Sequence, residues 1–162
     1  MNAATRTKIR FRIALWCDAR LLPFRIPRNR PLAEVLLLAR PPRSVFYPGL
    51  PSTYILKHVL KTTRRPILMR DRRCLRQGIL ACRFLAAAGH SSELHFGVDR
   101  TSLAGVLKAH CWVVYRGATV LNPPGPTTVP ILIHSAESGA RCDERQPSSI
   151  RSTYRSTTAS PT

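Results

Sequence analysis

The chain has 162 residues, and its apolar share of 44% is enough to form the core of one domain of ordinary size. Lys and Arg number 26 against 8 Asp and Glu, and this formal net charge of +18 favours anionic partners, although a solvated Arg-rich surface explains it equally well. The five cysteines are irregularly spaced and form no C-x-x-C pair, which argues against a disulfide scaffold and against a zinc site of that pattern.

The apolar runs near the N-terminus predict neither export nor membrane insertion. The stretch Ile13–Cys17 is too short for the hydrophobic part of a signal peptide. The later run Val35–Ala39 is too short to span a bilayer. We therefore expect a cytoplasmic protein with free thiols and no membrane partner.

Residues 1–65 are basic and apolar, and repeated prolines divide them into short pieces. The run Leu32–Arg40 predicts one short helix. A second helix is expected from Ser52 to Lys61, with one apolar face made of Ile55, Leu56, Val59 and Leu60. We interpret residues 1–65 as an N-terminal helical extension.

Residues 66–134 predict one helix followed by a small antiparallel sheet. The helix begins near Arg72 or Arg73 with Asp71 as its cap, continues with apolar residues at helical period, and ends at Gly89. Three strands are expected from their alternating or β-branched apolar residues: Glu93–Asp99, Ala109–Tyr115 and Ala118–Leu121. This order indicates an α+β fold.

Residues 135–162 are rich in Ser, Thr, Arg and Pro and nearly free of large apolar side chains. Such a segment buries too little surface to offset the entropy that is lost on ordering. We expect these residues to form a disordered C-terminal tail.

Cys74 is the candidate nucleophile because it lies at the start of the predicted helix. The free N–H groups and the dipole of a helix start favour an anion. Four arginines add positive charge nearby: Arg70, Arg72, Arg73 and Arg76. These influences lower the pKa of a thiol from about 8.5, and the thiolate is the form that attacks. The alternative is a small buried cysteine on a helix.

His110 and Asn122 are the candidate base and the residue that orients it. His110 lies at the start of the second strand, from which its imidazole can take the thiol proton and later protonate a leaving amine. Asn122 ends the third strand, and its side-chain oxygen can accept the ring N–H of His110. The alternatives are a strand histidine bonded to a carbonyl and an Asn in a turn. Catalysis requires the Cys74 sulfur within hydrogen-bonding reach of the imidazole.

The other cysteines and histidines of this region are assigned no catalytic role. Cys82 lies on the apolar face of the helix and is expected to be inert core. Cys111 should point to the sheet face opposite His110 and so lie outside the site. His95 is as consistent with exposure as with function, and no partner can be named for His58, His90 and His134. We expect no cofactor and no metal.

Papain-like and transglutaminase-like enzymes share one chain order of catalytic residues: a Cys at a helix start, a His on a strand, and an Asn or Asp on the next strand. Four blocks occur in order within residues 66–125: Cys74-Leu75, Gly89, E-L-x-x-G-V from Glu93, and A-H-x-W-V from Ala109. Together they resemble the transglutaminase-like core of lasso-peptide leader peptidases, which include the microcin-processing proteases.

The resemblance implies a cysteine protease that removes the leader from a ribosomally made precursor peptide. A separate ATP-dependent cyclase then closes the freed amine into a macrolactam. By position, Cys74 is the nucleophile and His110 the base. Many transglutaminase-like sites hold an Asp as the third member, whereas Asn122 stands at the matching position here.

The resemblance also implies a protein partner, because related proteins carry or work with a small leader-recognition domain. Residues 1–65 are too short and too broken by prolines to be that domain. We therefore expect a separate leader-recognition protein, and a basic surface that helps to hold an acidic leader.

Three other functions are compatible with the sequence. A small basic nucleic-acid-binding protein explains the charge but not the order of Cys, His and Asn, and no aromatic-rich RNA motif supports it. An inactive member of the same fold, which only holds peptide, is the second. The third keeps the thiol chemistry and passes the acyl group to an amine, as transglutaminases do.

Overall fold

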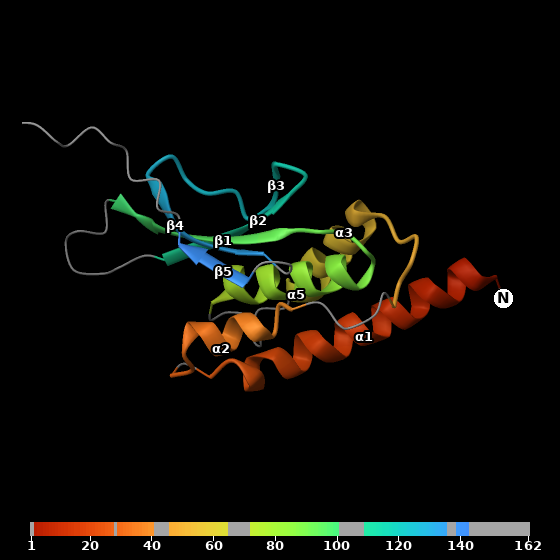
Figure 1. The fold of residues 1–162 in the computed structure, drawn as a ribbon. Coiled ribbons are helices and arrows are strands. Elements are labelled where there is room, and N and C mark those ends of the chain that lie inside the picture. The colour runs from red at the N-terminus through yellow and green to blue at the C-terminus, as the bar shows by residue number, and fades with distance from the viewer. Residues whose placement is uncertain are drawn as a thin grey trace, which may run out of the picture.

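The computed structural model describes residues 2–27, 29–40, 46–64, 72–100, 109–135 and 139–142. These residues form four helices and one five-stranded antiparallel sheet. Helix α5 (Arg73–Ala87) lies between the sheet and helix α1 (Ala3–Arg25) (Figure 1). The predicted α+β arrangement, a Cys-bearing helix followed by a small antiparallel sheet, is confirmed.

The sheet has the strand order β3-β2-β1-β4-β5, which makes β1 its central strand. The first three strands have the predicted bounds: β1 is Glu93–Asp99, β2 is Ala109–Tyr115 and β3 is Ala118–Leu121. Arg116 and Gly117 join β2 to β3 with positive φ angles of 52° and 76°, as a tight hairpin turn requires.

Strand β4 (Thr128–Ser135) is absent from the sequence prediction. Pro130 lies inside this strand, and a proline cannot donate a hydrogen bond to a neighbouring strand. The pairing of β4 with β1 shifts between Phe96 and Gly97, so that the register skips Ile131. This bulge lets the strand continue past the proline.

Strand β5 (Gly139–Cys142) pairs with β4, so these four residues depart from the predicted disorder of the tail. Main-chain hydrogen bonds to the edge of an existing strand need no large apolar side chain, which is why composition does not reveal such a strand. Ser135, the first residue of the predicted tail, ends β4, and the rest of that tail lies outside the described residues, as do the predicted cap Asp71 and the predicted domain boundary at residue 65.

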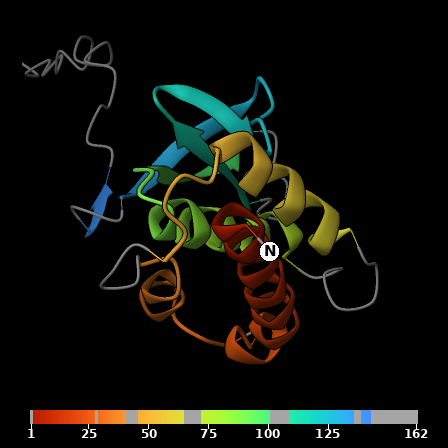
Figure 2. The same ribbon diagram turned by 90° about the vertical axis from the view of Figure 1, so that its right-hand side faces the viewer.

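One hydrophobic core connects the N-terminal helices with α5 and the sheet. Its fully buried members include Phe11, Leu15, Ile55, Val59, Ile79, Leu85, Leu94 and Val113. Figure 2 shows α1 next to α3 (Ser52–Thr63), with α5 behind them. The N-terminal helices therefore support the helix that carries Cys74.

Helix α1 has 23 residues and was not predicted, because apolar residues lie on two of its faces. One face is buried in the core through Phe11, Leu15, Ala19 and Leu22. The outer face exposes Ile9, Ile13, Trp16 and Phe24. A helix without one clearly polar side gives only a faint periodic pattern. No helix of the described residues is long and apolar enough to span a membrane.

The two short helices predicted in the N-terminal part are confirmed. Helix α2 covers Leu32–Leu37 and ends before the predicted Arg40. Helix α3 begins at Ser52 and buries three of the four predicted residues, but Leu60 is 37% exposed. Thr63, one turn further along the buried face, is enclosed instead, and its hydroxyl accepts a 2.8 Å hydrogen bond from the Gln77 amide of α5.

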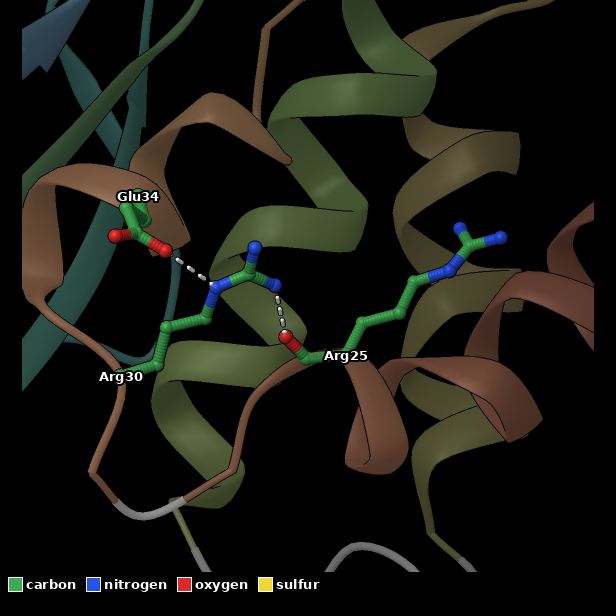
Figure 3. A network of polar contacts seen from close by, with 3 residues as sticks. All are labelled: Arg25, Arg30 and Glu34. Carbon is green, nitrogen blue, oxygen red and sulfur yellow. Dashed lines mark hydrogen bonds and ion pairs between the residues drawn. The ribbon is translucent and has the colours of Figure 1, made fainter.

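Arg30 holds the connection between α1 and α2 (Figure 3). Its Nη1 donates to the carbonyl of Arg25 at 2.7 Å, and its Nε lies 2.9 Å from a carboxylate oxygen of Glu34. Because these groups are exposed, we expect the ion pair of Arg30 and Glu34 to add little to the free energy of unfolding and mainly to fix the path of the chain.

The C-terminus of α5 is closed by Gly89, as predicted. Gly89 has a left-handed φ of 84°, its N–H bonds the carbonyl of Ala86, and the next N–H, that of His90, bonds the carbonyl of Leu85. The His90 ring lies 2.8 Å from the carbonyl of Leu50 and 3.2 Å from the Tyr115 hydroxyl. His90 thus has a structural role that the sequence did not reveal.

Candidate active site around Cys74

Cys74 is the second residue of α5, in the first turn of the helix. The preceding cap residue, Arg72, has a left-handed conformation with φ 52° and ψ 39°, and no side-chain hydrogen bond caps this turn. The first N–H groups of a helix have no carbonyl partner within it. One of them, the N–H of Leu75, donates to the Cys74 sulfur. The predicted placement at a helix start is confirmed.

Gly78 sets how closely α5 approaches the sheet. A Cβ at this position would lie 2.5 Å from Cδ1 of Leu94 and 3.8 Å from Sγ of Cys111. The absence of a side chain therefore lets strands β1 and β2 pack directly against the helix. This close packing brings the main chain and side chain of Cys111 to the first turn of α5.

Cys111 belongs to the site, contrary to the sequence prediction. Its side chain does alternate away from His110, and it is 2% exposed. However, the face to which it points is the one covered by α5, and there its S–H donates a hydrogen bond to the Cys74 sulfur. Alternation along a strand predicts the face to which a residue points, but not which face the nucleophile approaches.

The surroundings of Cys74 lower its pKa from 9.0 to about 5. The largest cause is the hydrogen bond from the Cys111 thiol, which outweighs the opposing effect of burial. The N–H of Cys111, the charge of His110 and the N–H of Leu75 lower the pKa further. This shift favours the thiolate, which is the nucleophilic form.

His110 acts on the sulfur through its charge, whereas the hydrogen bonds that lower the Cys74 pKa come from Cys111 and Leu75. The His110 Nε2 lies 3.1 Å from the main-chain carbonyl of Asn122. Because a carbonyl only accepts, Nε2 carries a hydrogen and Nδ1 is the nitrogen left to exchange a proton. The imidazole also stacks on the Trp112 ring, with centroids 6.3 Å apart and planes 19° from parallel.

Asn122 contacts both partners, but not in the way the sequence predicted. Its main-chain carbonyl, not its side-chain oxygen, accepts the His110 hydrogen bond. Its side-chain Nδ2 donates instead to the carbonyl of Cys74 at 3.4 Å. The residue has a left-handed φ of 52°, which Asn tolerates better than most residues. Asn122 therefore connects the end of β3 with the first turn of α5.

A family comparison agrees with this geometry. The model of the Transglutaminase-like superfamily matches residues 19–129, more than half of the chain. The chain belongs to this superfamily. No curated protein and no solved structure matches it. The matched range includes α2 and α3, which the sequence analysis assigned to the N-terminal extension.

Membership in the Transglutaminase-like superfamily gives the fold, which typically carries a cysteine protease or an acyltransferase. It does not by itself give the activity of this member. Among the described residues, no three His, Cys, Asp or Glu side chains gather as a metal site would require.

The outer face of the sheet adds residues near His110 to this transglutaminase-like site. Trp112 is 6% exposed and stands between two imidazoles, with its ring centroid 5.6 Å from that of His95 and 6.3 Å from that of His110. His95 in turn lies 2.8 Å from a carboxylate oxygen of Glu93. The alternation of polar residues on β1 indicates that the His95 side chain points away from the core. It does not indicate that the His95 ring contacts Trp112, which in turn contacts His110.

The remaining candidates are buried or packed against other side chains. Cys82 is buried in the core, as predicted, and burial raises its pKa to about 12. His58 lies against the Tyr54 ring at 4.4 Å. His134 is buried, which lowers its pKa.

Proposed function

We propose that the chain is a cysteine protease that removes the leader from a ribosomally made lasso-peptide precursor. The observation that carries the proposal is the position of Cys74 in the first turn of α5, where its sulfur accepts hydrogen bonds from Cys111 and Leu75 and interacts with the charge of His110. The order of motifs from Cys74 to Trp112, which resembles that of the leader peptidases, supports the choice of substrate.

In the first half of the proposed reaction, the Cys74 thiolate attacks the carbonyl carbon of the last leader residue. Main-chain N–H groups at the start of α5, that of Cys74 among them, are placed to stabilise the oxyanion. The C–N bond then breaks as protonated His110 gives its Nδ1 proton to the leaving amine of the core peptide. The hydrogen bond to Asn122 keeps Nε2 occupied during this transfer.

In the second half, water hydrolyses the thioester between the leader and Cys74. His110 removes a proton from the water, the C–S bond breaks, and the thiolate is restored. Because the hydrogen bonds from Cys111 and Leu75 stabilise the thiolate, they also make it a better leaving group. The core peptide, with its new free amine, passes to a separate ATP-dependent macrolactam cyclase in the cytoplasm.

We assign the outer face of α1 to the leader-recognition protein. Ile9, Ile13, Trp16 and Phe24 are 41%, 60%, 50% and 77% exposed, and they recur at helical spacing along one side. Exposed arginines border this stripe: Arg6, Arg10 and Arg12. An apolar stripe with a basic border is complementary to an apolar groove with acidic residues around it.

Binding of a leader-recognition protein from the same gene cluster tests this assignment. Ile13→Asp in α1 should weaken binding at least tenfold by calorimetry, because it places a charge in the middle of the stripe. Ile131→Asp in β4 is the matched control, since Ile131 is also 50% exposed but lies on the sheet. Equal effects of the two substitutions would contradict the assignment.

The activity itself is tested by incubating the chain, with its recognition protein, with a lasso-peptide precursor and measuring product masses. Hydrolysis gives a free leader acid and a core peptide with a free amine. Transfer of the acyl group to an added amine would instead give a leader amide, which is the transglutaminase outcome. An unchanged precursor with a fully reactive Cys74 would contradict the proposed function.

A further inference from the structure

The Cys111 thiol is a second sulfur in the site that the proposed acyl transfer does not use as a reactant. It is buried in the core cluster, while Cys74 is partly exposed. Their side chains are joined by a hydrogen bond, with Cys111 as the donor and Cys74 as the acceptor. The two sulfurs therefore meet from different elements, the first turn of α5 and strand β2.

We propose that Cys111 is a resolving thiol, which forms a reversible disulfide with Cys74 after a hydroperoxide has oxidised Cys74. The proposal goes beyond the proposed function, because it requires only the two thiols and their contact. In the oxidised form the nucleophile is unavailable, so the site would be switched off without being destroyed.

Two balanced steps describe this chemistry. In the first, the Cys74 thiolate attacks one oxygen of the hydroperoxide, the O–O bond breaks, and the products are a sulfenic acid on Cys74 and, after one proton is taken up, water or an alcohol. In the second, the Cys111 sulfur attacks the Cys74 sulfur, an S–S bond forms, and the sulfenic oxygen leaves with the Cys111 proton as water. Sulfur is oxidised and the peroxide oxygen reduced.

The two sulfurs have the different properties that this sequence of steps requires. The hydrogen bonds to Cys74 lower its pKa and its side chain is partly exposed, so it is the sulfur that a peroxide meets first. Cys111 is enclosed and its pKa is raised by donating to Cys74 and by burial, so it stays protonated until Cys74 has been oxidised. Cys82 is enclosed too and donates no hydrogen bond to Cys74, which makes it the matched control.

The experiment uses the full chain with Cys17 and Cys142 replaced by Ser, which leaves thiols at positions 74, 82 and 111. Hydrogen peroxide is added, and intact mass and peptide maps are measured before and after dithiothreitol. We expect the mass to fall by two hydrogens, a peptide cross-linked between Cys74 and Cys111, and recovery of nearly all iodoacetamide labelling at Cys74 after reduction.

Cys111→Ser keeps a hydrogen-bond donor beside Cys74 but cannot form the disulfide. In this variant, excess peroxide should add two or three oxygens to Cys74, and at least a tenfold smaller share of the labelling should return after reduction. Cys82→Ala should behave like the parent. Equal recovery in the parent and in Cys111→Ser, or a cross-link between Cys74 and Cys82, would overturn the proposal. Because the readout is mass, the result does not depend on whether a substrate is cleaved.

Discussion

Cys74 and Cys82 lie on the same helix about two turns apart, yet their thiols have opposite properties. In the first turn, hydrogen bonds from Cys111 and Leu75 lower the Cys74 pKa to about 5. Two turns later, apolar packing raises the Cys82 pKa to about 12. Burial raises the pKa of both thiols, so burial alone does not decide the outcome. The difference comes from the hydrogen-bond donors that face the sulfur.

Two elements, the start of α5 and strand β2, create the surroundings that distinguish Cys74 from Cys82. The hydrogen-bond donors to Cys74 are Leu75 at the helix start and Cys111 on β2. Cys111 lies before Val113, where the pairing of β2 with β3 begins. Cys82 faces the interior, where the main-chain N–H groups are already used within the helix. A helix start that meets the part of β2 without a β3 partner is therefore what separates the two thiols.

The largest expected effect comes from removing the Cys74 sulfur, and removal of the Cys82 sulfur is its matched control. Cys74→Ala should lower precursor cleavage by on the order of 10⁴-fold or more, as loss of a nucleophile does in comparable enzymes. Cys82→Ala should cut at the parental rate and lose only about 1 kcal/mol of unfolding free energy. Cleavage is followed by mass spectrometry and folding by thermal denaturation. Processing by a folded Cys74→Ala variant would remove Cys74 from the mechanism.

A second substitution separates ionisation of the thiol from proton transfer. His110→Gln should lower cleavage by about 10²- to 10⁴-fold, because no group remains to protonate the leaving amine. Alkylation of Cys74 by iodoacetamide at pH 7 should persist, since the donors from Cys111 and Leu75 are intact. If alkylation instead fell to the rate of Cys82, the thiolate would depend on the imidazole.

The pH dependence of alkylation tests the cause of the low pKa. A thiol reacts only when it is ionised, so the rate for Cys74 should fall as the pH drops through about 5 and be constant near pH 7. Cys111→Ala removes the largest lowering influence, so the midpoint should move to higher pH. An unchanged midpoint would mean that the helix start and His110 suffice.

The left-handed backbone at Asn122 predicts a smaller effect that depends on the substituted residue. Asn122→Gly keeps φ near 52° without strain, and the carbonyl that accepts from His110 remains. Asn122→Val should cost about 1–2 kcal/mol of unfolding free energy and also lower cleavage. Both variants lose the side-chain bond to Cys74, so their difference isolates the backbone. Equal stability and activity of the two variants would contradict a role for the left-handed backbone at this position.

The smallest expected effect is that of salt. If the net charge of +18 helps to hold an acidic leader, 0.5 M NaCl (against roughly 0.05 M) should weaken leader binding by several-fold, as measured by fluorescence anisotropy. A leader with its acids replaced by amides is the control and should respond little. Salt-independent capture would argue against this role, and tight binding of random nucleic acid would favour the nucleic-acid alternative.

Local patterns in the sequence predicted the elements that carry the site. Short-range periodicity and turn residues predict the bounds of β1 to β3, the start of α5 and its end at Gly89. The pattern did not reveal β4, because Pro130 is tolerated only through a bulge that depends on pairing with β1. Helix α1 was missed because it is apolar on two sides.

The contacts within the site could be predicted only in part. Cys74, His110 and Asn122 were named from their chain order, and the structure brings all three together. Cys111 was excluded because the side of the sheet that α5 covers cannot be deduced from alternation alone. The use of the Asn122 carbonyl in place of its side chain depends on a left-handed backbone that sequence does not specify. The catalytic roles of these residues stay predictions.

The stacking of Trp112 on His110 has an optical consequence. A cationic imidazole that lies against an indole quenches its fluorescence, whereas a neutral imidazole does so weakly. The chain has two tryptophans, and the other, Trp16, is half exposed on α1, far along the chain from the site. Replacing Trp16 by Phe would leave a single emitter, Trp112, whose brightness reports the charge of the two imidazoles beside it, His95 and His110, with no added dye.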